Sequence, residues 1–210
     1  MKVNIPNKRQ GQGDWRIMFG NLNGFPLETS KANEIKLDIW GNLFKQADAD
    51  VVGVAEHKLN IPRLGRRDKP SNIMRNWREG LVGRYSWLQN NEEGKYELGG
   101  TGIISSSIGT THTIREGMDS RRLGRWNWIT LQGKKGKKTT IVTVYRPEEG
   151  QQTLQRQFAR LRAKGIIKEG ETTLTIWEKD LLTLIKSSID NNNTQRLLIS
   201  IALPSPSGYA

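Results

Sequence analysis

The stretch Val51-Val52-Gly53-Val54-Ala55-Glu56-His57-Lys58 decides the fold class of this chain. Its first five residues form a short, continuous apolar run, which is typical of a strand buried on both faces. Glu56 follows that run directly and therefore stands at the carboxyl end of the predicted strand. In open α/β sheets this end of a strand is where ligands bind, so Glu56 is the first candidate functional residue.

The residues before this stretch predict a helix and an earlier strand. Ser30 can cap a helix whose apolar residues recur on one face at helical spacing. These residues are Ile35, Ile39, Trp40, Leu43 and Ala47. Residues 15–19 form another apolar run that predicts a buried strand, and the turn sequence Asn21-Leu22-Asn23-Gly24 follows it. Strand, helix and strand in this order indicate an α/β domain.

The remainder of the chain predicts a β-rich centre and two further helices. The expected elements are strands at residues 85–89, 102–105, 111–114, 125–131 and 139–145, helices at 153–164 and 175–189, and a last strand at 196–201. The residues expected to be buried on the two helices are Leu154, Phe158, Leu161, Trp177, Leu181, Leu184 and Ile185. The pattern fits two sheets packed together with helices outside, although it fits other α/β folds as well.

Composition limits the class of protein. The 210 residues suffice for one domain, and the net charge of +12 indicates a polyanionic partner, with a merely solvated basic surface as the alternative. Because there is no cysteine, disulfides, thiolate metal sites and cysteine nucleophiles are excluded. Residues 1–13 are read as a flexible basic tail without a signal-peptide core, and no apolar run reaches the ~20 residues that span a bilayer. We therefore expect an intracellular protein of the nucleus or cytoplasm that is not secreted and has no membrane partner.

Three polar features follow predicted strands. Glu56 offers a carboxylate to a divalent cation, or it simply pairs with Lys58. Asn21 and Asn23 could orient a phosphate or a metal-bound water by hydrogen bonds, or they only supply the geometry of a turn. Tyr145 ends the last strand of the β-rich centre, where its hydroxyl could reach a scissile phosphate or point to water.

A glycine-rich segment, Gly99-Gly100-Thr101-Gly102, adds a place where backbone could approach a ligand closely. Hydrolysis of a phosphodiester needs several groups to converge. A metal neutralises the phosphate, a base activates water, and a hydrogen-bond donor steadies the oxygens of the transition state. The common position of the polar features at strand ends fits such a convergence.

The order of these motifs resembles the endonuclease/exonuclease/phosphatase family, and within it the apurinic-endonuclease-like domains of non-LTR retroelements. The motifs are Asn21-Leu22-Asn23-Gly24, Val54-Ala55-Glu56-His57-Lys58, Gly99 to Ile103, Arg125-Trp126 and Val142 to Pro147. The resemblance spans residues 14–203 and implies a deoxyribonuclease-like fold, a four-layer helix–sheet–sheet–helix sandwich. It also implies hydrolysis of phosphodiester bonds in DNA, with Mg²⁺, or alternatively Mn²⁺, as the cofactor.

The resemblance implies roles for five residues. Asn21 and Tyr145 match catalytic positions, and Tyr145 matches the tyrosine that contacts the phosphate. Glu56 matches the metal-binding glutamate, and Asn23 matches a position where many relatives carry an acid that helps to organise the metal. Lys58 matches a position that is often polar or basic.

Departures from the family pattern concentrate near the end of the sequence. Many relatives carry an asparagine soon after the Tyr-x-Pro element, where Glu148 stands here. Their matching strand ends in Asp-x-Asn, which supplies the base, whereas Ile201-Ala202-Leu203-Pro204 stands here, and no later Asp-His pair precedes Ala210. We therefore expect the N-terminal two-thirds of a domain that is truncated at its C-terminus. We further expect a disordered tail at residues 204–210 and little or no nuclease activity.

Basic residues gather in one part of the sequence. Residues 121–138 contain seven Lys or Arg and no acid, with two tryptophans between them, at least one of which is expected in the core. One interpretation is a positive rim along a nucleic-acid groove, since each neutralised phosphate adds a salt-dependent contribution to affinity. The alternative is that the tryptophans pack between the sheets and the lysines simply lie at the tip of a hairpin. The expected nucleic-acid contacts are Lys58, Arg121, Arg122, Arg125, Lys134, Lys135 and Arg146.

Three functions stay open at this point. The leading hypothesis is a Mg²⁺-dependent DNA endonuclease domain that is inactive as it stands. The second is a non-catalytic, basic nucleic-acid-binding remnant of a retroelement protein, which would bind DNA equally well in EDTA. The third is the phosphatase or phospholipase branch of the same family. A monomer is expected.

Overall fold

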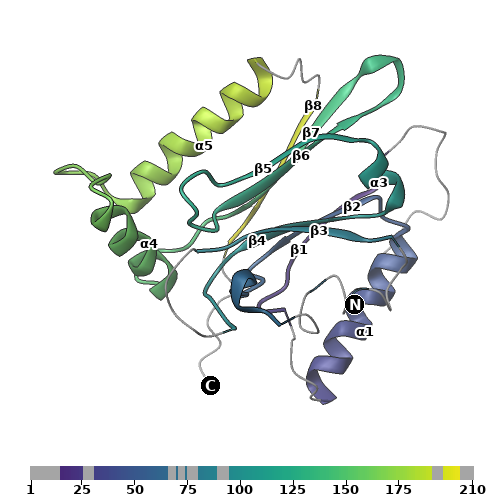
Figure 1. Ribbon diagram of the computed structural model, residues 1–210, viewed down its shortest axis with the longest axis horizontal. Coiled ribbons are helices and arrows are strands. Elements are labelled where there is room, and N and C mark those ends of the chain that lie inside the picture. Colours follow the sequence, from purple (N-terminus) through teal and green to yellow (C-terminus); the bar gives the residue numbers. More distant parts are fainter. Residues whose placement is uncertain are drawn as a thin grey trace.

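Two stacked β-sheets with helices on both outer faces form the molecule, as the computed structural model in Figure 1 shows. The structure describes residues 15–25, 31–65, 70, 74, 80–88, 95–190 and 196–203. The arrangement confirms the predicted four-layer helix–sheet–sheet–helix sandwich. The two expected tails, residues 1–13 and 204–210, and the capping residue Ser30 lie outside the described residues.

The first sheet has the strand order β1-β2-β4-β3. The strands are β1 (Ile17–Asn21), β2 (Val51–Ala55), β3 (Val82–Ser86) and β4 (Thr101–Ser105). β1 runs parallel to β2, and their last residues, Asn21 and Ala55, are neighbours. Parallel strands need a long crossover, and here it contains helix α1 (Lys31–Ala47). As predicted, β2 is buried along its whole length.

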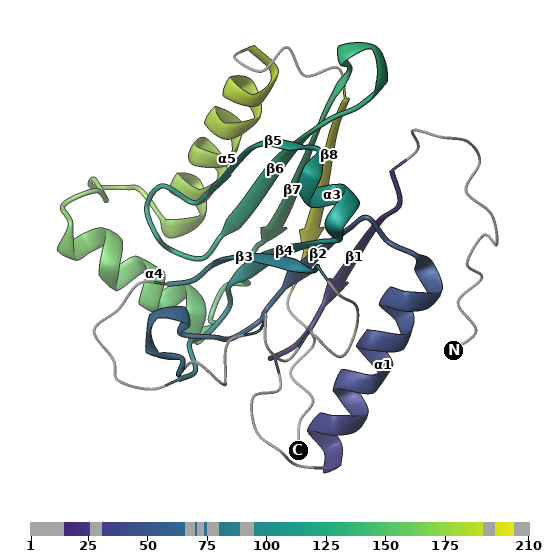
Figure 2. The same ribbon diagram turned by 45° about the vertical axis from the view of Figure 1, so that its right-hand side comes forward.

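The second sheet has the strand order β5-β6-β7-β8. The strands are β5 (Thr113–Met118), β6 (Trp126–Gln132), β7 (Lys138–Tyr145) and β8 (Arg196–Ala202). β7 runs parallel to β8, and their last residues, Tyr145 and Ala202, are paired. The chain between them forms α4 (Gln152–Ala163) and α5 (Thr173–Asp190), which lie on the side of the molecule away from α1 (Figure 2). Each sheet thus brings the carboxyl ends of two parallel strands to one edge.

Apolar side chains from both sheets fill the space between them. The central cluster is fully buried and consists of Val51, Ile103, Ile129, Leu131 and Ile141. Complete burial of an aliphatic side chain of this size contributes about 1.5–3 kcal/mol. This layer fixes the two sheets face to face and so determines which strand ends can meet.

Helix α1 buries only part of the predicted face. Trp40 packs against the core and Ala47 is buried, as predicted. Phe44 is buried as well, but Ile35 and Ile39 are 52% and 54% exposed. The reason lies in β1, where Gly20 has no side chain. A Cβ built at Gly20 would come within 2.2 Å of the Trp40 ring. The indole therefore needs this glycine, and its contact sets a rotation of α1 that leaves both isoleucines outside.

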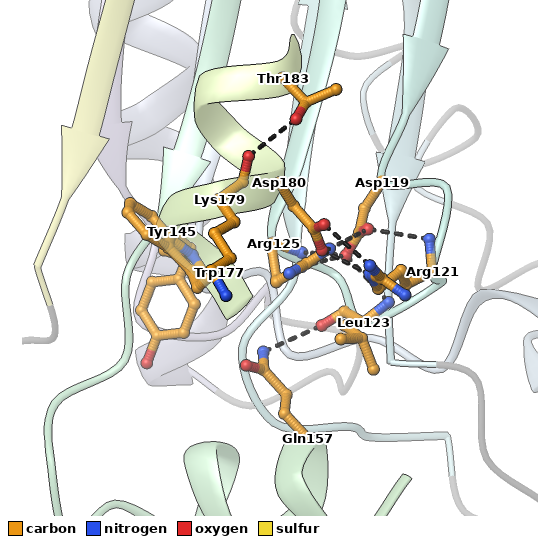
Figure 3. A network of polar contacts seen from close by, with 10 residues as sticks. All are labelled: Asp119, Arg121, Leu123, Arg125, Tyr145, Gln157, Trp177, Lys179, Asp180 and Thr183. Carbon is orange, nitrogen blue, oxygen red and sulfur yellow. Dashed lines mark hydrogen bonds and ion pairs between the residues drawn. The ribbon is translucent and has the colours of Figure 1, made fainter. Parts of the chain in front are cut away.

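Helices α4 and α5 cover the second sheet. The predicted buried residues of α5 are confirmed, two of them fully and two partly: Trp177, Leu181, Leu184 and Ile185. On α4, Leu161 is buried as predicted, but Phe158 is 38% exposed. Gln157 faces inward in its place, because its Nε2 donates to the Leu123 carbonyl at 3.0 Å (Figure 3). A buried amide with such a partner is tolerated in a core.

Several boundaries differ from the sequence prediction by a few residues. β1 extends to Asn21, which is therefore the last strand residue rather than part of a turn. β5 begins only at Thr113, because Ser106 caps a short helix, α3 (Ser107–Thr111), by accepting the Gly109 N–H. Two 3₁₀ turns are also described, η1 (Ile61–Arg63) and η3 (Lys134–Gly136). Among the described helices, none combines the length and the apolar character that crossing a membrane requires.

Candidate active site at the shared strand ends

Three residues predicted from separate strands meet at one edge of the molecule. Glu56 follows β2, Asn21 ends β1 and Tyr145 ends β7. Asn21 Nδ2 donates to Glu56 Oε2 at 2.8 Å, and the Tyr145 hydroxyl donates to Glu56 Oε1 at 2.9 Å. Side chains from both sheets therefore converge on one carboxylate, which is the centre of the candidate site.

The backbone that carries this carboxylate has an unusual conformation. The φ angles are +50° at Glu56 and +54° at Lys58, in the left-handed region that non-glycine residues seldom adopt. Gly24 N donates to the Glu56 carbonyl at 2.6 Å, and Lys58 N donates to the Gly99 carbonyl at 2.9 Å. Strained backbone of this kind concentrates at functional sites, where the surroundings enforce it.

The Glu56 carboxylate is only 6% exposed and has no cationic partner among the described residues. The alternative ion pair with Lys58 is not formed, since Lys58 Nζ donates to Asn23 Oδ1 at 2.6 Å. A buried charge is costly unless it is paired or bound to a metal. No cluster of three or more acidic, His or Cys side chains suited to a metal occurs in the described part of the chain. A cation here would rely on one carboxylate and on substrate oxygens, a combination that Mg²⁺ accepts.

Asn23 does not meet Glu56, in contrast to its expected role at the metal. Its side-chain oxygen accepts a hydrogen bond from the Lys58 ammonium group, and its backbone N–H donates to Asn21 Oδ1 at 2.8 Å. A cation would have to displace Lys58 to reach that oxygen. Asn23 has a φ of +44°, which asparagine tolerates. The structure therefore gives Asn23 a part in shaping the loop after β1.

Asn21 joins the ends of three strands. Besides its bond to Glu56, its Nδ2 donates to the Leu203 carbonyl just beyond β8 at 3.2 Å. Both amide hydrogens and the amide oxygen thus have partners. The contacts make Asn21 a residue that orients the carboxylate and fixes the end of β8 beside it.

Tyr145 is buried, with 1% of its surface exposed. Burial, followed by the charge and the hydrogen bond of Glu56, raises the pKa of the Tyr145 hydroxyl well above its usual value. The hydroxyl therefore stays a proton donor throughout the physiological range. Gln151 Oε1 lies 3.3 Å from it. Sequence reasoning missed Gln151, because a glutamine in a loop before a helix carries no distinguishing signal.

The glycine pair before β4 supports the site from behind instead of opening it to a ligand. Gly99 and Gly100 have φ angles of +73° and +89°. A Cβ at Gly99 would meet the Tyr145 ring at 3.0 Å, and one at Gly100 would meet the His57 ring at 2.5 Å. Both rings occupy space that only glycine leaves open, so the expected ligand contact at this segment is replaced by packing.

His57 lies between Glu56 and Lys58 and is completely buried. Its Nδ1 accepts the Leu59 N–H at 3.0 Å, and its Nε2 lies 2.8 Å from the Ser86 carbonyl. The neutral ring therefore carries its proton on Nε2. Burial lowers the pKa of His57 to about 4, although hydrogen bonding to the backbone acts to raise it.

Acid is expected to destabilise the fold through His57. The folded-state pKa of about 4 lies below the usual 6.5, so the unfolded chain binds the proton first as the pH falls. The contribution is complete above pH 6.5, declines between pH 6.5 and 4, and amounts to about 3 kcal/mol. Urea unfolding at pH 8, 6.5, 5.5 and 4.5 measures it. A His57→Gln variant should lose this part of the pH dependence. A His112→Gln variant, which changes an exposed histidine, should keep it. Equal slopes of the free energy of unfolding against pH in the two variants would contradict the assignment.

A pocket of about 250 Å³ opens beside Asn21, one of the three converging residues. It is lined by Phe19, Gly20, Asn21, Gly53, Ala55, Thr143, Ser200, Ala202 and Leu203. The Thr143 hydroxyl is buried and has no hydrogen-bond partner among the described residues. Ser200 and Ala202 reach the same pocket because alternate residues of a strand share a face. Ala202 adds only a methyl group at the position where the family resemblance places an acid.

Arg125 is a buried structural residue, so the expected nucleic-acid contact at this position is wrong. Its side chain is 1% exposed, and its Nε and Nη2 donate to the two oxygens of Asp119 at 2.7 Å each (Figure 3). Nη2 also donates to Asp180 at 2.9 Å. The guanidinium lies 4.1 Å from the ring centroid of Trp126, which is itself buried and confirms that one tryptophan of the basic segment belongs to the core.

One ion-pair network joins Arg121 to Arg125, Asp119 and Asp180. Arg121 Nε and Nη2 donate to the two oxygens of Asp180 at 2.5 and 2.9 Å. Burial acts to raise the pKa of Asp180, but the hydrogen bonds and charges of Arg121 and Arg125 outweigh it and lower the pKa. The guanidinium of Arg121 is already engaged, so contact with a phosphate there stays a prediction and requires this pair to open.

The ion-pair network holds the strand end that carries Tyr145. Tyr145 N donates to the Arg125 carbonyl at 2.8 Å, and Trp177 Nε1 donates to the Tyr145 carbonyl at 3.4 Å. Trp177 and Asp180 both lie on α5, so the ion pair of Asp180 with Arg125 keeps the two contacts together. Figure 3 shows the Tyr145 hydroxyl turned away from these ion pairs.

The other basic residues lie at separate places. Arg146 is partly buried next to Tyr145, and Arg122 is exposed in the turn between β5 and β6. Lys134 and Lys135 are exposed at the tip of the β6–β7 hairpin, before the first residue of β7. The seven steps from that first residue to Tyr145 span about 23 Å at strand geometry. The expected positive rim is therefore divided between the two ends of the second sheet.

Three solved structures illustrate the similarity to known proteins. The catalytic domain of human Nocturnin, solved with a bound sulfate anion, matches 90% of this chain and 66% of its own length at 13% identity and a TM-score of 0.50. An AP endonuclease from Archaeoglobus fulgidus matches 71% of this chain and 52% of its own length at 17% identity and a TM-score of 0.41. An endonuclease/exonuclease/phosphatase family protein from Leptotrichia buccalis matches 74% of this chain and 64% of its own length at 11% identity and a TM-score of 0.45. The chain thus spans about half to two thirds of the length of these structures.

The sequence itself matches no family model and no curated protein. The likeness to the Nocturnin domain therefore concerns the fold alone. It agrees with the two four-stranded sheets, the parallel strand pair in each sheet and the helices on both outer faces. This chain has the deoxyribonuclease-like sandwich fold of solved enzymes of the endonuclease/exonuclease/phosphatase type.

Proposed function

We propose that this chain is a divalent-metal-dependent phosphodiesterase-type domain that acts on nucleic acid, with DNA as the substrate and Mg²⁺ as the metal. One observation carries the proposal. Asn21 and Tyr145 converge from different sheets on the Glu56 carboxylate, which is buried and lacks a cationic partner among the described residues. The net charge of +12 supports a polyanionic substrate.

The contacts of each residue support a distinct role. Glu56 would hold the metal through oxygens that Asn21 and Tyr145 orient. Tyr145 keeps its single proton, which it now donates to Glu56; with a metal on that carboxylate, the hydroxyl would turn and donate to an oxygen of the phosphate instead. A bound divalent cation would neutralise phosphate charge and stabilise the oxygens during displacement.

Turnover is expected to be weak, because the end of β8 provides no base. Ala202 is the strand partner of Tyr145 and shares the pocket with Asn21, but a methyl group cannot accept a proton from water. A positioned general base typically contributes about 10²–10⁴-fold in rate. The proposed site thus combines metal and phosphate binding with a missing base.

Replacing Glu56 by glutamine should abolish the response of the protein to Mg²⁺. If Mg²⁺ binds with a dissociation constant of about 1 mM, then 10 mM Mg²⁺ stabilises the wild type by about 1.4 kcal/mol. Glu56→Gln removes the charged ligand and should show no such gain. In EDTA the variant should be as stable as the wild type or more so, because it buries no charge. Thermal and urea unfolding with and without Mg²⁺ measure both effects.

The matched control is Glu178→Gln, which removes an exposed carboxylate on α5. It should respond to Mg²⁺ as the wild type does. A plasmid-nicking assay gives the functional readout, in which slow Mg²⁺-dependent nicking should disappear in Glu56→Gln and in Tyr145→Phe. An unchanged Mg²⁺ response in Glu56→Gln, or nicking that persists in EDTA, would refute the proposed function.

A nucleic-acid-binding domain without catalysis is the second candidate, and Ala202 favours it. The motif order around Asn21, Glu56 and Tyr145, together with the basic charge, supports descent from a retroelement-type endonuclease rather than from a phosphatase or phospholipase. Equal DNA affinity in Mg²⁺ and EDTA, without any nicking, would select this candidate. Release of phosphate from inositol phosphates would instead select the phosphatase branch.

A further inference from the structure

Two lysines from different elements converge on the loop after β1. Lys36, on α1, donates through Nζ to the carbonyls of Asn23 at 3.1 Å and Gly24 at 2.6 Å. Lys58, two residues after Glu56, donates through Nζ to Asn23 Oδ1 at 2.6 Å. Both ammonium groups thus hold the same residue, which lies two positions from Asn21 in the candidate active site.

Within the described residues, this pair of charges has no anionic partner. Neither Lys36 nor Lys58 forms an ion pair with a carboxylate in the part of the chain that the structure describes. An ammonium group has three donors. Lys36 uses two of them and Lys58 uses one, so three donors in this small region have no protein acceptor among the described residues.

Keeping two ammonium groups together without an anion is unfavourable. Burial, and to a lesser extent the charge of Lys58, lowers the pKa of Lys36, so the repulsion is the smaller of the two causes. The backbone adds to the cost, since Lys58 and Asn23 have φ angles of +54° and +44°. The conformation of the loop after β1 does not need both charges, because the Lys36 ammonium group alone already binds the carbonyls of Asn23 and Gly24.

We propose that Lys36 and Lys58 form a phosphate subsite that binds one backbone phosphate of a nucleic acid, adjacent to the phosphate at Glu56. The proposal deepens the proposed function, because it positions the substrate of that site. Lysine binds phosphate as a point charge, so two lysines that contact the same loop can share one phosphate without base recognition. The subsite would orient the strand across the edge where β1, β2 and β7 end.

The test is DNA binding in EDTA, which separates this proposal from metal binding and catalysis. Fluorescence anisotropy with a fluorescein-labelled 20-bp duplex gives the dissociation constant between 50 and 300 mM KCl. The variants are Lys36→Met, Lys58→Met and the double variant, because methionine keeps an unbranched apolar stem and removes the charge. The matched control is Lys45→Met, which removes an exposed lysine from the same helix.

One shared phosphate predicts a particular salt dependence. The slope of log K against log salt should fall by about 0.9 in the double variant, and the dissociation constant at 0.1 M salt should rise about eightfold. Lys45→Met should leave the slope unchanged. A double variant with the slope of the Lys45→Met control would overturn the subsite. A fall of about 1.8 would also overturn it, because the lysines would then contact two separate phosphates.

A second measurement on the wild type covers the case in which the double variant does not fold. Inorganic phosphate should shift the amide NMR signals of Asn23 and Gly24 and leave that of Lys45 in place. The absence of a shift at Asn23 and Gly24 would overturn the proposal. If the wild type showed no response to Mg²⁺ in a parallel titration, that result would count against the metal site alone.

Discussion

Replacing Ala202 by aspartate is expected to raise the rate of Mg²⁺-dependent plasmid nicking by about 10²–10⁴-fold, the usual contribution of a general base. Ala202 is the strand partner of Tyr145 and lines the 250 Å³ pocket together with Asn21 and Thr143. A carboxylate at this position would have space in a pocket that also borders Asn21, the hydrogen-bond partner of Glu56. The measurement is the initial rate of conversion of supercoiled to nicked plasmid.

Two control variants make this gain specific. Ala202→Asn has nearly the same shape without a base, so it should stay at the wild-type rate. Ala202→Asp combined with Glu56→Gln should lose the gain, because the metal is no longer held. In EDTA, Ala202→Asp should also lower the free energy of unfolding, since a second carboxylate near Glu56 is repelled, and Mg²⁺ should restore it. Equal rates for the aspartate and asparagine variants would show that β8 does not supply the missing base.

The substitution Asp119→Asn is expected to lower the free energy of unfolding by about 3 kcal/mol, the lower end of the usual cost of removing the partner of a buried charge, because Arg125 keeps its ion pair with Asp180. Asp119 is fully buried and accepts two bonds from Arg125, and its oxygens also accept the N–H groups of Arg121 and Leu123 at 3.0 and 3.1 Å. The asparagine keeps the shape but not the charge. Urea unfolding at pH 7.5 measures the loss.

The matched control for this prediction is Arg121→Gln. Its ion pair with Asp180 is partly exposed, at 31% and 20% of the two side chains, so its loss should cost at most about 1 kcal/mol. The double variant Asp119→Asn/Arg125→Met should recover part of the stability, because it leaves no buried guanidinium with only Asp180 as its anionic partner. A loss below about 1 kcal/mol in Asp119→Asn would show that Arg125 does not depend on Asp119. The rate of plasmid nicking by a folded but less stable Asp119→Asn variant would also show whether the ion-pair network positions Tyr145, whose backbone this network holds.

The local pattern of residues determined the elements that carry the site. The apolar run before Glu56 fixed β2 without error, because a strand buried on both faces needs an unbroken apolar run. The positions of Asn21 and Glu56 at strand ends likewise predicted that these two residues meet, since parallel neighbours end at the same edge of a sheet. Tyr145 ends a strand of the other sheet, so its contact with Glu56 depends on how the two sheets pack. The rotation of α1 was not predictable in this way, because it depends on one glycine in another element that accommodates Trp40.

Charged residues show most clearly what the sequence left undecided. Arg125 and Lys134 have the same sign and stand in one basic segment, yet Arg125 is buried between two acids and Lys134 is exposed at a hairpin tip. Nothing local separates them, because the partners of Arg125 include Asp180, 55 residues away on another element. Lys36 is a similar case, since its role follows from where α1 packs and not from its neighbours in the chain.

By itself, the sequence determined the α/β class, most of the strands and the positions of Asn21, Glu56 and Tyr145 at strand ends, because these follow from short-range periodicity and from the residues that end each strand. Only the tertiary structure decided that the Asn23 side chain contacts Lys58 and not Glu56, that Arg125 is part of the core, and that Lys36 and Lys58 both contact Asn23. Those outcomes depend on the distances between side chains from remote elements, which are set by the packing of two sheets and not by any local pattern.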